Sequence, residues 1–190
     1  MKQFLLQLRY ILRVSDVFYL RPITPPVTPG VVVRLAAETG GCFDLHRVVW
    51  TCSFLATDGG RMLCWYRAPD AESARLALKE LGSDMNAVWP GMVIGDLSPD
   101  GEGISRFNTL AEITYERPLP AGDDEILHRL GRGSLSDIPV AAAFLSSDRR
   151  RMIGLLQAPD FDAASAALAA DSLPVESVWP CTVITPPRPA

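Results

Sequence analysis

Short segments of this chain mix apolar and polar positions and are bounded by glycine, proline or aspartate, which is the pattern of β-strands joined by turns. Residues 47–56 and 61–68 are rich in β-branched and aromatic residues and flank the turn sequence TDGG, so they predict a β-hairpin. Pro69 then ends the second strand, and Asp70 is placed to cap a helix that we expect over residues 71–82. A further strand is predicted at residues 87–94.

The same succession of elements returns later in the chain. Residues 50–94 align without a gap on residues 140–184, with FLATDGGRM opposite FLSSDRRRM. Ala-Pro-Asp at 68–70 recurs at 158–160, and Val-Trp-Pro at 88–90 recurs at 178–180. Matches of this kind in a single frame predict an internal duplication.

A weaker match extends the repeat upstream at a different offset. The strand candidates FYLRPI (18–23) and TYERPL (114–119) share Tyr-x-Arg-Pro, and shorter helical candidates follow them at 30–38 and 123–130. Each half is therefore predicted to run βαββαβ, the order of a ferredoxin-like fold. We expect a leader at 1–16, repeats at 17–97 and 111–190, and a linker at 98–110.

A single ferredoxin-like sheet carries helices on one face only, so its other face must be buried against something. Two repeats in one chain can bury these faces against each other. The predicted fold class is therefore α+β, with two tandem ferredoxin-like βαββαβ repeats packed sheet to sheet as an intramolecular α+β barrel.

The hairpin motif W-x-x-SFL…DG-R-x-LC-x-Y-x-APDAE and the closing VWP resemble a bacterial family of small ferredoxin-like proteins, largely of unknown function, that is sometimes labelled nickel-binding-protein-like. The resemblance implies a Glu-Arg pair on the first strand, which Glu116 and Arg117 match, whereas at Leu20 and Arg21 only the arginine is kept. It also implies a histidine two residues after a tryptophan. Cys52 and Ala142 stand at that position, so the histidine-based metal site is missing and no metal is expected.

Composition narrows the classes of partner. A net charge of −4 with 21% charged residues argues against nucleic acid. No stretch approaches the roughly 18 uninterrupted apolar residues of a membrane span. Arg9 and Arg13 interrupt the apolar run of the leader, so we expect no membrane partner, a cytoplasmic location, and a leader that packs on the protein or on a partner. The four cysteines form no C-x-x-C pair, which disfavours a zinc knuckle.

Strand alternation predicts which side chains face the interior of the barrel. In the first half we assign Trp50, Cys52, Phe54, Cys64 and Tyr66 to that face, with Leu63 and Trp65 against the helices. In the second half the inward set is small and apolar: Val140, Ala142, Phe144, Met152, Gly154 and Leu156. This asymmetry predicts an apolar cavity whose ligand-binding residues are Trp50, Cys52, Phe54, Cys64 and Phe144. The alternative is a filled core whose residues diverged after duplication.

The candidate catalytic residues are Glu116, His46 and Tyr66. Within a cavity, desolvation would raise the pKa of Glu116 and suit it to general acid or base catalysis. The alternative is an ion pair of Glu116 with Arg21 or Arg117 at the rim of the barrel. His46, with Asp44 as a partner, either reaches the mouth of the barrel or is an exposed loop histidine.

The leading hypothesis is a small-molecule-binding α+β barrel. It would be a cofactor-independent enzyme of the monooxygenase, isomerase or cyclase type that moves a proton on an apolar or aromatic substrate, and it would be a monomer or a homodimer. No phosphate-binding or dinucleotide-binding pattern indicates a cofactor. The alternative is a non-catalytic metal-binding or stress-associated protein that uses Cys52, Cys64 and His46. A third possibility is an interaction module that docks through its leader.

Overall fold

The computed structural model describes residues 14–80, 82, 87–95, 97, 103–120, 122, 140–170 and 173–186. The helix expected at 123–130 and nearly all of the leader lie outside these residues. In the first half of the chain the elements are β1 (Ser15–Pro22), α2 (Pro29–Glu38), α3 (Gly40–Leu45), β2 (Val49–Ala56), β3 (Arg61–Ala68), α4 (Ala71–Lys79) and β4 (Val88–Gly95). In the second half they are the 3₁₀-helix η2 (Ile104–Arg106), β5 (Thr109–Thr114), β6 (Val140–Ser146), β7 (Arg151–Leu156), α6 (Phe161–Ala170) and β8 (Val175–Ile184).

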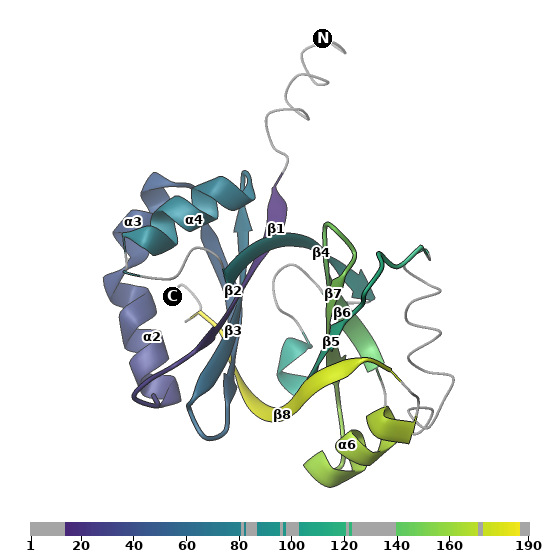
Figure 1. The fold of residues 1–190 in the computed structure, drawn as a ribbon. Coiled ribbons are helices and arrows are strands. Elements are labelled where there is room, and N and C mark those ends of the chain that lie inside the picture. Colours follow the sequence, from purple (N-terminus) through teal and green to yellow (C-terminus); the bar gives the residue numbers. More distant parts are fainter. Residues whose placement is uncertain are drawn as a thin grey trace.

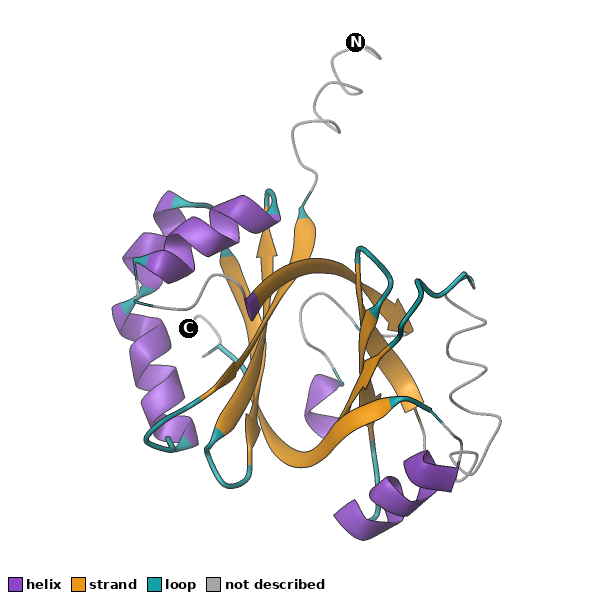
Figure 2. Ribbon diagram, in the orientation of Figure 1, coloured by secondary structure: helices purple, strands orange, loops and turns teal. Residues whose placement is uncertain are grey.

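The strands close into one antiparallel barrel in the order β1-β3-β2-β8-β5-β7-β6-β4 (Figure 1). The two halves meet edge to edge, because β2 pairs with β8 and β4 pairs with β6. Helices α2, α3 and α4 lie outside the barrel against the strands of the first half, and α6 lies outside it in the second half (Figure 2). The predicted α+β class and the predicted barrel are confirmed.

Aromatic side chains fill the interior of the barrel. Phe144 of β6 lies 4.4 Å from Phe18, 5.9 Å from Phe54 and 5.4 Å from Trp65, measured between ring centroids. A barrel of eight strands is just wide enough for side chains to fill it, so these rings leave a packed core. Ile104 and Phe107, which fall in the predicted linker, join the same buried cluster.

Corresponding contacts occur in both halves. The Thr57 N–H donates to the Pro180 carbonyl at 3.1 Å, and the Ser147 N–H donates to the Pro90 carbonyl at 2.9 Å. When residues 50–94 are aligned with residues 140–184, Thr57 aligns with Ser147 and Pro90 aligns with Pro180. A register shift occurs at the same place in each half, between Trp50 and Cys52 and between Val140 and Ala142.

The upstream part of the sequence alignment is wrong. In the structure Pro22 lies opposite Arg61 on the neighbouring strand, and Thr114 lies opposite Arg151. Because Arg61 and Arg151 correspond, Pro22 corresponds to Thr114, and Leu20 corresponds to Glu112. The expected strand at 114–119 is therefore misplaced: β5 ends at Thr114 and already begins at Thr109, inside the predicted linker.

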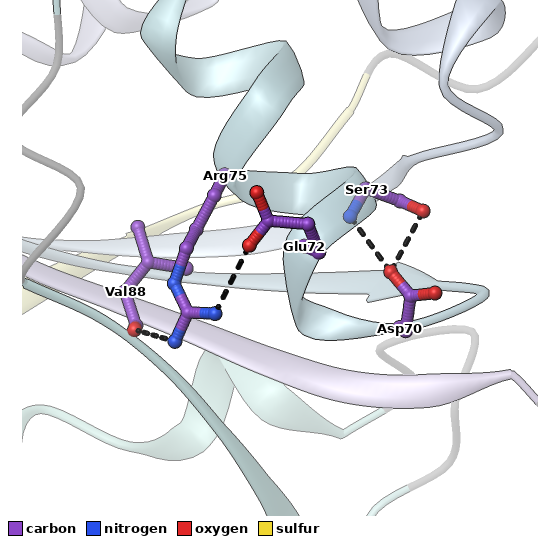
Figure 3. A network of polar contacts seen from close by, with 5 residues as sticks. All are labelled: Asp70, Glu72, Ser73, Arg75 and Val88. Atoms are coloured by element: carbon purple, nitrogen blue, oxygen red, sulfur yellow. Dashed lines mark hydrogen bonds and ion pairs between the residues drawn. The ribbon is translucent and has the colours of Figure 1, made fainter.

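The predicted cap of the helix after the hairpin is confirmed. The Asp70 carboxylate accepts the Ser73 N–H at 2.7 Å and the Ser73 hydroxyl at 2.8 Å (Figure 3). Farther along α4, Arg75 donates to the Val88 carbonyl of β4 at 3.1 Å and lies 3.4 Å from Glu72. The cap fixes where α4 begins, and Arg75 ties the helix to β4.

Asp70→Ala should lower the free energy of unfolding by about 1 kcal/mol at neutral pH, because two donors of Ser73 lose their acceptor. These bonds hold the pKa of Asp70 below its usual value. The stabilisation is therefore present at neutral pH and is lost as the pH falls through the pKa of the folded state. Urea unfolding of the wild type and the variant at several pH values measures this. Asp70→Asn, which keeps an acceptor without a charge, is the control. If the difference in free energy of unfolding between the wild type and Asp70→Ala grew in acid, the assignment would be contradicted.

Candidate ligand-binding site

A β-bulge in β2 decides which side chains of the first half face the barrel. Trp50 lies opposite Tyr66 and Cys52 lies opposite Trp65, so Thr51 is the extra residue. Two residues of β2 thereby advance against one residue of β3, and the alternation changes face at this point. Cys52 and Phe54 point into the barrel, as predicted, whereas Trp50 packs on the side of the helices.

The predicted facing of β3 is wrong. Cys64 and Tyr66 lie in the cluster under the helices, and Leu63 and Trp65 point into the barrel. The same reversal holds in β7, where Met152 and Leu156 pack outside the barrel and Ile153 and Leu155 pack inside it. The prediction placed Cys64 on the same face as Phe54, whereas the hairpin pairs Phe54 with Leu63 and Cys52 with Trp65. A shift of one residue in this register moves every side chain of β3 to the other face. Ala142 and Phe144 are inside the barrel, as predicted.

A cavity of about 280 Å³ lies on the outer face of the first-half sheet, under α2 and α3. It therefore occupies the opposite face from the one predicted, yet it brings together three of the predicted residues: Trp50, Cys64 and Tyr66. Its other lining residues are mostly apolar: Tyr19, Arg21, Ile23, Val27, Val32, Leu35, Ala36, Thr39, Phe43, Ser53, Met62 and Leu78. Such a space with a few convergent polar groups is the usual form of a small-molecule site.

A chain of hydrogen bonds runs along the floor of this cavity. The Trp50 indole N–H donates to the Ser53 hydroxyl at 3.0 Å, and that hydroxyl donates to the Cys64 sulfur at 3.0 Å. The Tyr66 side chain also hydrogen-bonds Cys64, and its ring packs edge-on against Phe43 of α3 at 5.4 Å. The thiol, the serine hydroxyl and the phenol are thus held in fixed positions by one another and by the helix above them.

Arg21 supplies the positive charge of the cavity. Its guanidinium lies 5.3 Å from the centre of the Tyr19 ring, and its charge acts on both Cys64 and Tyr66. The Nε atom of Arg21 is buried and has no hydrogen-bond partner. Within the described part of the chain no carboxylate forms an ion pair with Arg21. A buried donor of this kind is an exception among folded proteins and calls for an acceptor.

Burial sets the protonation of the cavity's acids. Desolvation raises the pKa of Tyr66 well above its usual value, and it also raises the pKa of Cys64 despite the nearby Arg21 charge. Both groups are therefore neutral hydrogen-bonding groups at physiological pH. The lining residues include no carboxylate and no histidine. The cavity can bind a molecule and donate hydrogen bonds to it, but among these residues it has no base suited to neutral pH.

The three predicted catalytic residues are not brought together. Glu116 lies beyond the end of β5 and is exposed, so it does not face the cavity and the condition for its catalytic role is not met. His46 follows α3, where its Nε2 lies 3.4 Å from the Glu80 carboxylate rather than against Asp44. Tyr66 alone lines the cavity.

The two cysteines proposed as a pair point to opposite faces of the sheet. Cys52 is in the barrel and Cys64 is under the helices, so they do not converge on one metal or redox site. Among the residues that the structure describes, no group of three histidine, cysteine, aspartate or glutamate side chains could hold a metal ion. Burial raises the pKa of Cys52 well above its usual value and that of Cys181 to about 12.

Sequence reasoning missed a polar cluster at one mouth of the barrel. Glu112 of β5 accepts hydrogen bonds from Arg61 and from the Trp179 indole, each at 2.8 Å. Its side chain is only 14% exposed, so the carboxylate is held between these donors at the edge of the core. The sequence feature that could have indicated this cluster is the single carboxylate within TLAEIT. It was not recognised because the strand was predicted at 114–119 instead of 109–114.

No protein-family model matches this chain, and no curated protein matches it. Among solved structures it is similar to a protein provisionally named a chlorite dismutase (12% identity, 90% of this chain and 95% of the other, TM-score 0.44). It is also similar to an anthrone oxidase-like protein (16% identity, 91% of this chain and 91% of the other, TM-score 0.43). A third similar structure is of a protein provisionally named a monooxygenase from Lactobacillus acidophilus (11% identity, 90% of this chain and 96% of the other, TM-score 0.42). These similarities are too distant to assign a function.

None of the described helices has both the length and the apolar character that crossing a membrane requires.

Cys42 should be the first thiol to react in the native protein, because Cys52, Cys64 and Cys181 are buried. The hydrogen bond between Cys42 and the Glu80 carboxylate raises the pKa of the Cys42 thiol. The rate at which Cys42 reacts should therefore keep rising above the pH at which an ordinary thiol has ionised. Labelling with a disulfide reagent across alkaline pH measures this rate. Cys42→Ser should abolish the fast reaction, and a fast reaction that survived in that variant would contradict the burial of the other three.

Proposed function

We propose that this protein binds a small, mainly apolar molecule that carries an anionic or other hydrogen-bond-accepting group. The simplest such molecule is a substituted aromatic ring. The proposed site is the cavity under α2 and α3, with Arg21 as the anchor. The observation that carries the proposal is the buried Arg21 Nε, which has no partner in a cavity that is otherwise mostly apolar. An acceptor on the ligand would satisfy this donor, and the ligand's charge would balance the guanidinium.

The size and the walls of the cavity support this class of ligand. Its volume of about 280 Å³ exceeds the roughly 150 Å³ of an engineered cavity that binds benzene, so it suits one substituted ring. Val32, Phe43 and Met62 offer apolar contact, while Tyr66 offers a neutral phenol. These features favour binding over proton transfer, so the proposal assigns no catalytic role to Glu116 or His46.

We also infer that the chain is a tandem duplication of one ferredoxin-like βαββαβ unit. Three features support it: the two interstrand contacts of Thr57 and Ser147, the matching register shifts, and the equivalent strand orders β4-β1-β3-β2 and β8-β5-β7-β6. On this view the site arose in the first half only. Cys64, Tyr66 and Trp50 correspond to Gly154, Leu156 and Val140, so the second half lacks the polar groups of the cavity.

The matched probes benzoate and benzyl alcohol test the proposed function, since they differ chiefly in the negative charge. Both should perturb the NMR signal of the Met62 methyl group, and benzoate should bind more tightly. Arg21→Gln should weaken benzoate about tenfold or more and leave benzyl alcohol nearly unchanged, because one charge-assisted hydrogen bond is lost.

Arg34→Gln is the control, because it removes an equal charge from the exposed face of α2. If neither probe perturbs Met62, or if the two arginine variants weaken benzoate equally, the proposed site is wrong.

A further inference from the structure

At one mouth of the barrel, two arginines each contact a tryptophan of the other half. Arg61 of the first half lies 5.9 Å from the centre of the Trp179 ring, and Arg151 of the second half lies 6.0 Å from that of Trp89. Arg61 aligns with Arg151 and Trp89 aligns with Trp179, so these are two versions of one arrangement. A comparison of the two shows what each version contains.

The version around Trp179 is complete. The Trp179 indole N–H donates to Oε1 of Glu112 at 2.8 Å, and Nη1 of Arg61 donates to the same oxygen at 2.8 Å. Nη1 of Arg61 also donates to the Ser177 hydroxyl at 2.8 Å. One carboxylate therefore joins a cation to a buried indole N–H.

The version around Trp89 lacks that carboxylate. The Trp89 side chain is more than nine-tenths buried, at 8% exposure, and its indole N–H has no hydrogen-bond partner. The residue that corresponds to Glu112 is Leu20, and the residue that corresponds to Ser177 is Ala87. Across the described ranges, no carboxylate lies within ion-pair distance of Arg151. Both the cation and the indole donor thus lack the partner that their counterparts have.

The space and the charge at this mouth suit an anion. Leu20, Ala87 and Arg151 line a hollow of about 450 Å³, and Trp89 and Arg151 line an adjoining hollow of about 420 Å³. The first hollow is bordered by Arg21, Arg61 and Arg151 against the carboxylates Glu112 and Glu176. The second is bordered by Arg150 and Arg151 against the carboxylate Asp148, so arginines outnumber carboxylates in each. Since Arg151 is exposed, its side chain can swing away from the Trp89 ring to admit a group.

We propose that this mouth binds a small molecule through a carboxylate group, which takes the place that Glu112 has in the other half. One oxygen of that carboxylate accepts the Trp89 indole N–H, and the carboxylate pairs with the guanidinium of Arg151. Arg21 borders both this mouth and the cavity under α2, whereas Trp89 and Arg151 line only the mouth. The test therefore rests on Trp89 and Arg151, and its outcome is independent of the function proposed for that cavity.

Acetate is the probe, because it carries the carboxylate and no ring. The protein has four tryptophans, and three of the indole N–H groups already have acceptors: Ser53 for Trp50, Asp16 for Trp65 and Glu112 for Trp179. In ¹⁵N-labelled protein at constant ionic strength, acetate should move the Trp89 indole signal downfield in a saturable manner and leave the other three in place. Trp89→Phe assigns the signal.

Two variants decide between this site and general attraction of anions. Arg151→Gln, at an exposed position, should weaken acetate about tenfold or more, whereas Arg34→Gln, which removes the same charge elsewhere, should not. Leu20→Glu supplies the missing carboxylate from the chain itself, so its Trp89 signal should lie downfield before any addition and should no longer respond.

The proposal is overturned if acetate leaves the Trp89 signal unmoved. It is also overturned if Arg151→Gln and Arg34→Gln bind acetate equally well, since the response would then owe nothing to the guanidinium of Arg151.

Discussion

The packing of Phe144 against Phe18, Phe54 and Trp65 is the contact on which the rest of the structure depends. It joins β6 of the second half to three strands of the first half at the centre of the barrel. Each half presents an open sheet face that water would otherwise contact, and the aromatic rings bury both faces at once. A filled barrel has no room for a ligand at its centre, so any binding site has to lie at its mouth or on its outer face.

The cavity under α2 and α3 follows from this constraint. Where Trp65 and Leu63 point inward to complete the core, their neighbours Cys64 and Tyr66 must point outward, beneath the helices. The same alternation leaves Arg21 on the outer side of β1, with Tyr19. At the mouth, β5 carries Glu112 at the position where β1 carries Leu20, and this difference leaves Trp89 and Arg151 without the partner that Trp179 and Arg61 have.

Much of the fold could be predicted because it rests on local patterns: the hairpins, the helix cap at Asp70 and the aligned segments 50–94 and 140–184. The side-chain faces could not, because both the bulge beside Cys52 and the register that pairs Phe54 with Leu63 depend on the pairing of β2 with β3, which no local pattern marks. Glu116 was misassigned because Tyr-x-Arg-Pro recurs at an offset that strand pairing does not follow. Trp50, Cys64 and Tyr66 still share one cavity, because the bulge turns Trp50 to the outer face, where the pairing with β2 also places Cys64 and Tyr66.

The central claim is that the interior of the barrel is closed and that the space for an apolar ligand lies outside it, in the cavity under α2 and α3. A crystal of the protein held under xenon tests it most directly, because xenon occupies apolar cavities without needing a specific group. The account predicts xenon density under α2, beside Val32 and Met62. Density among Phe18, Phe54 and Phe144, with none under α2, would contradict it.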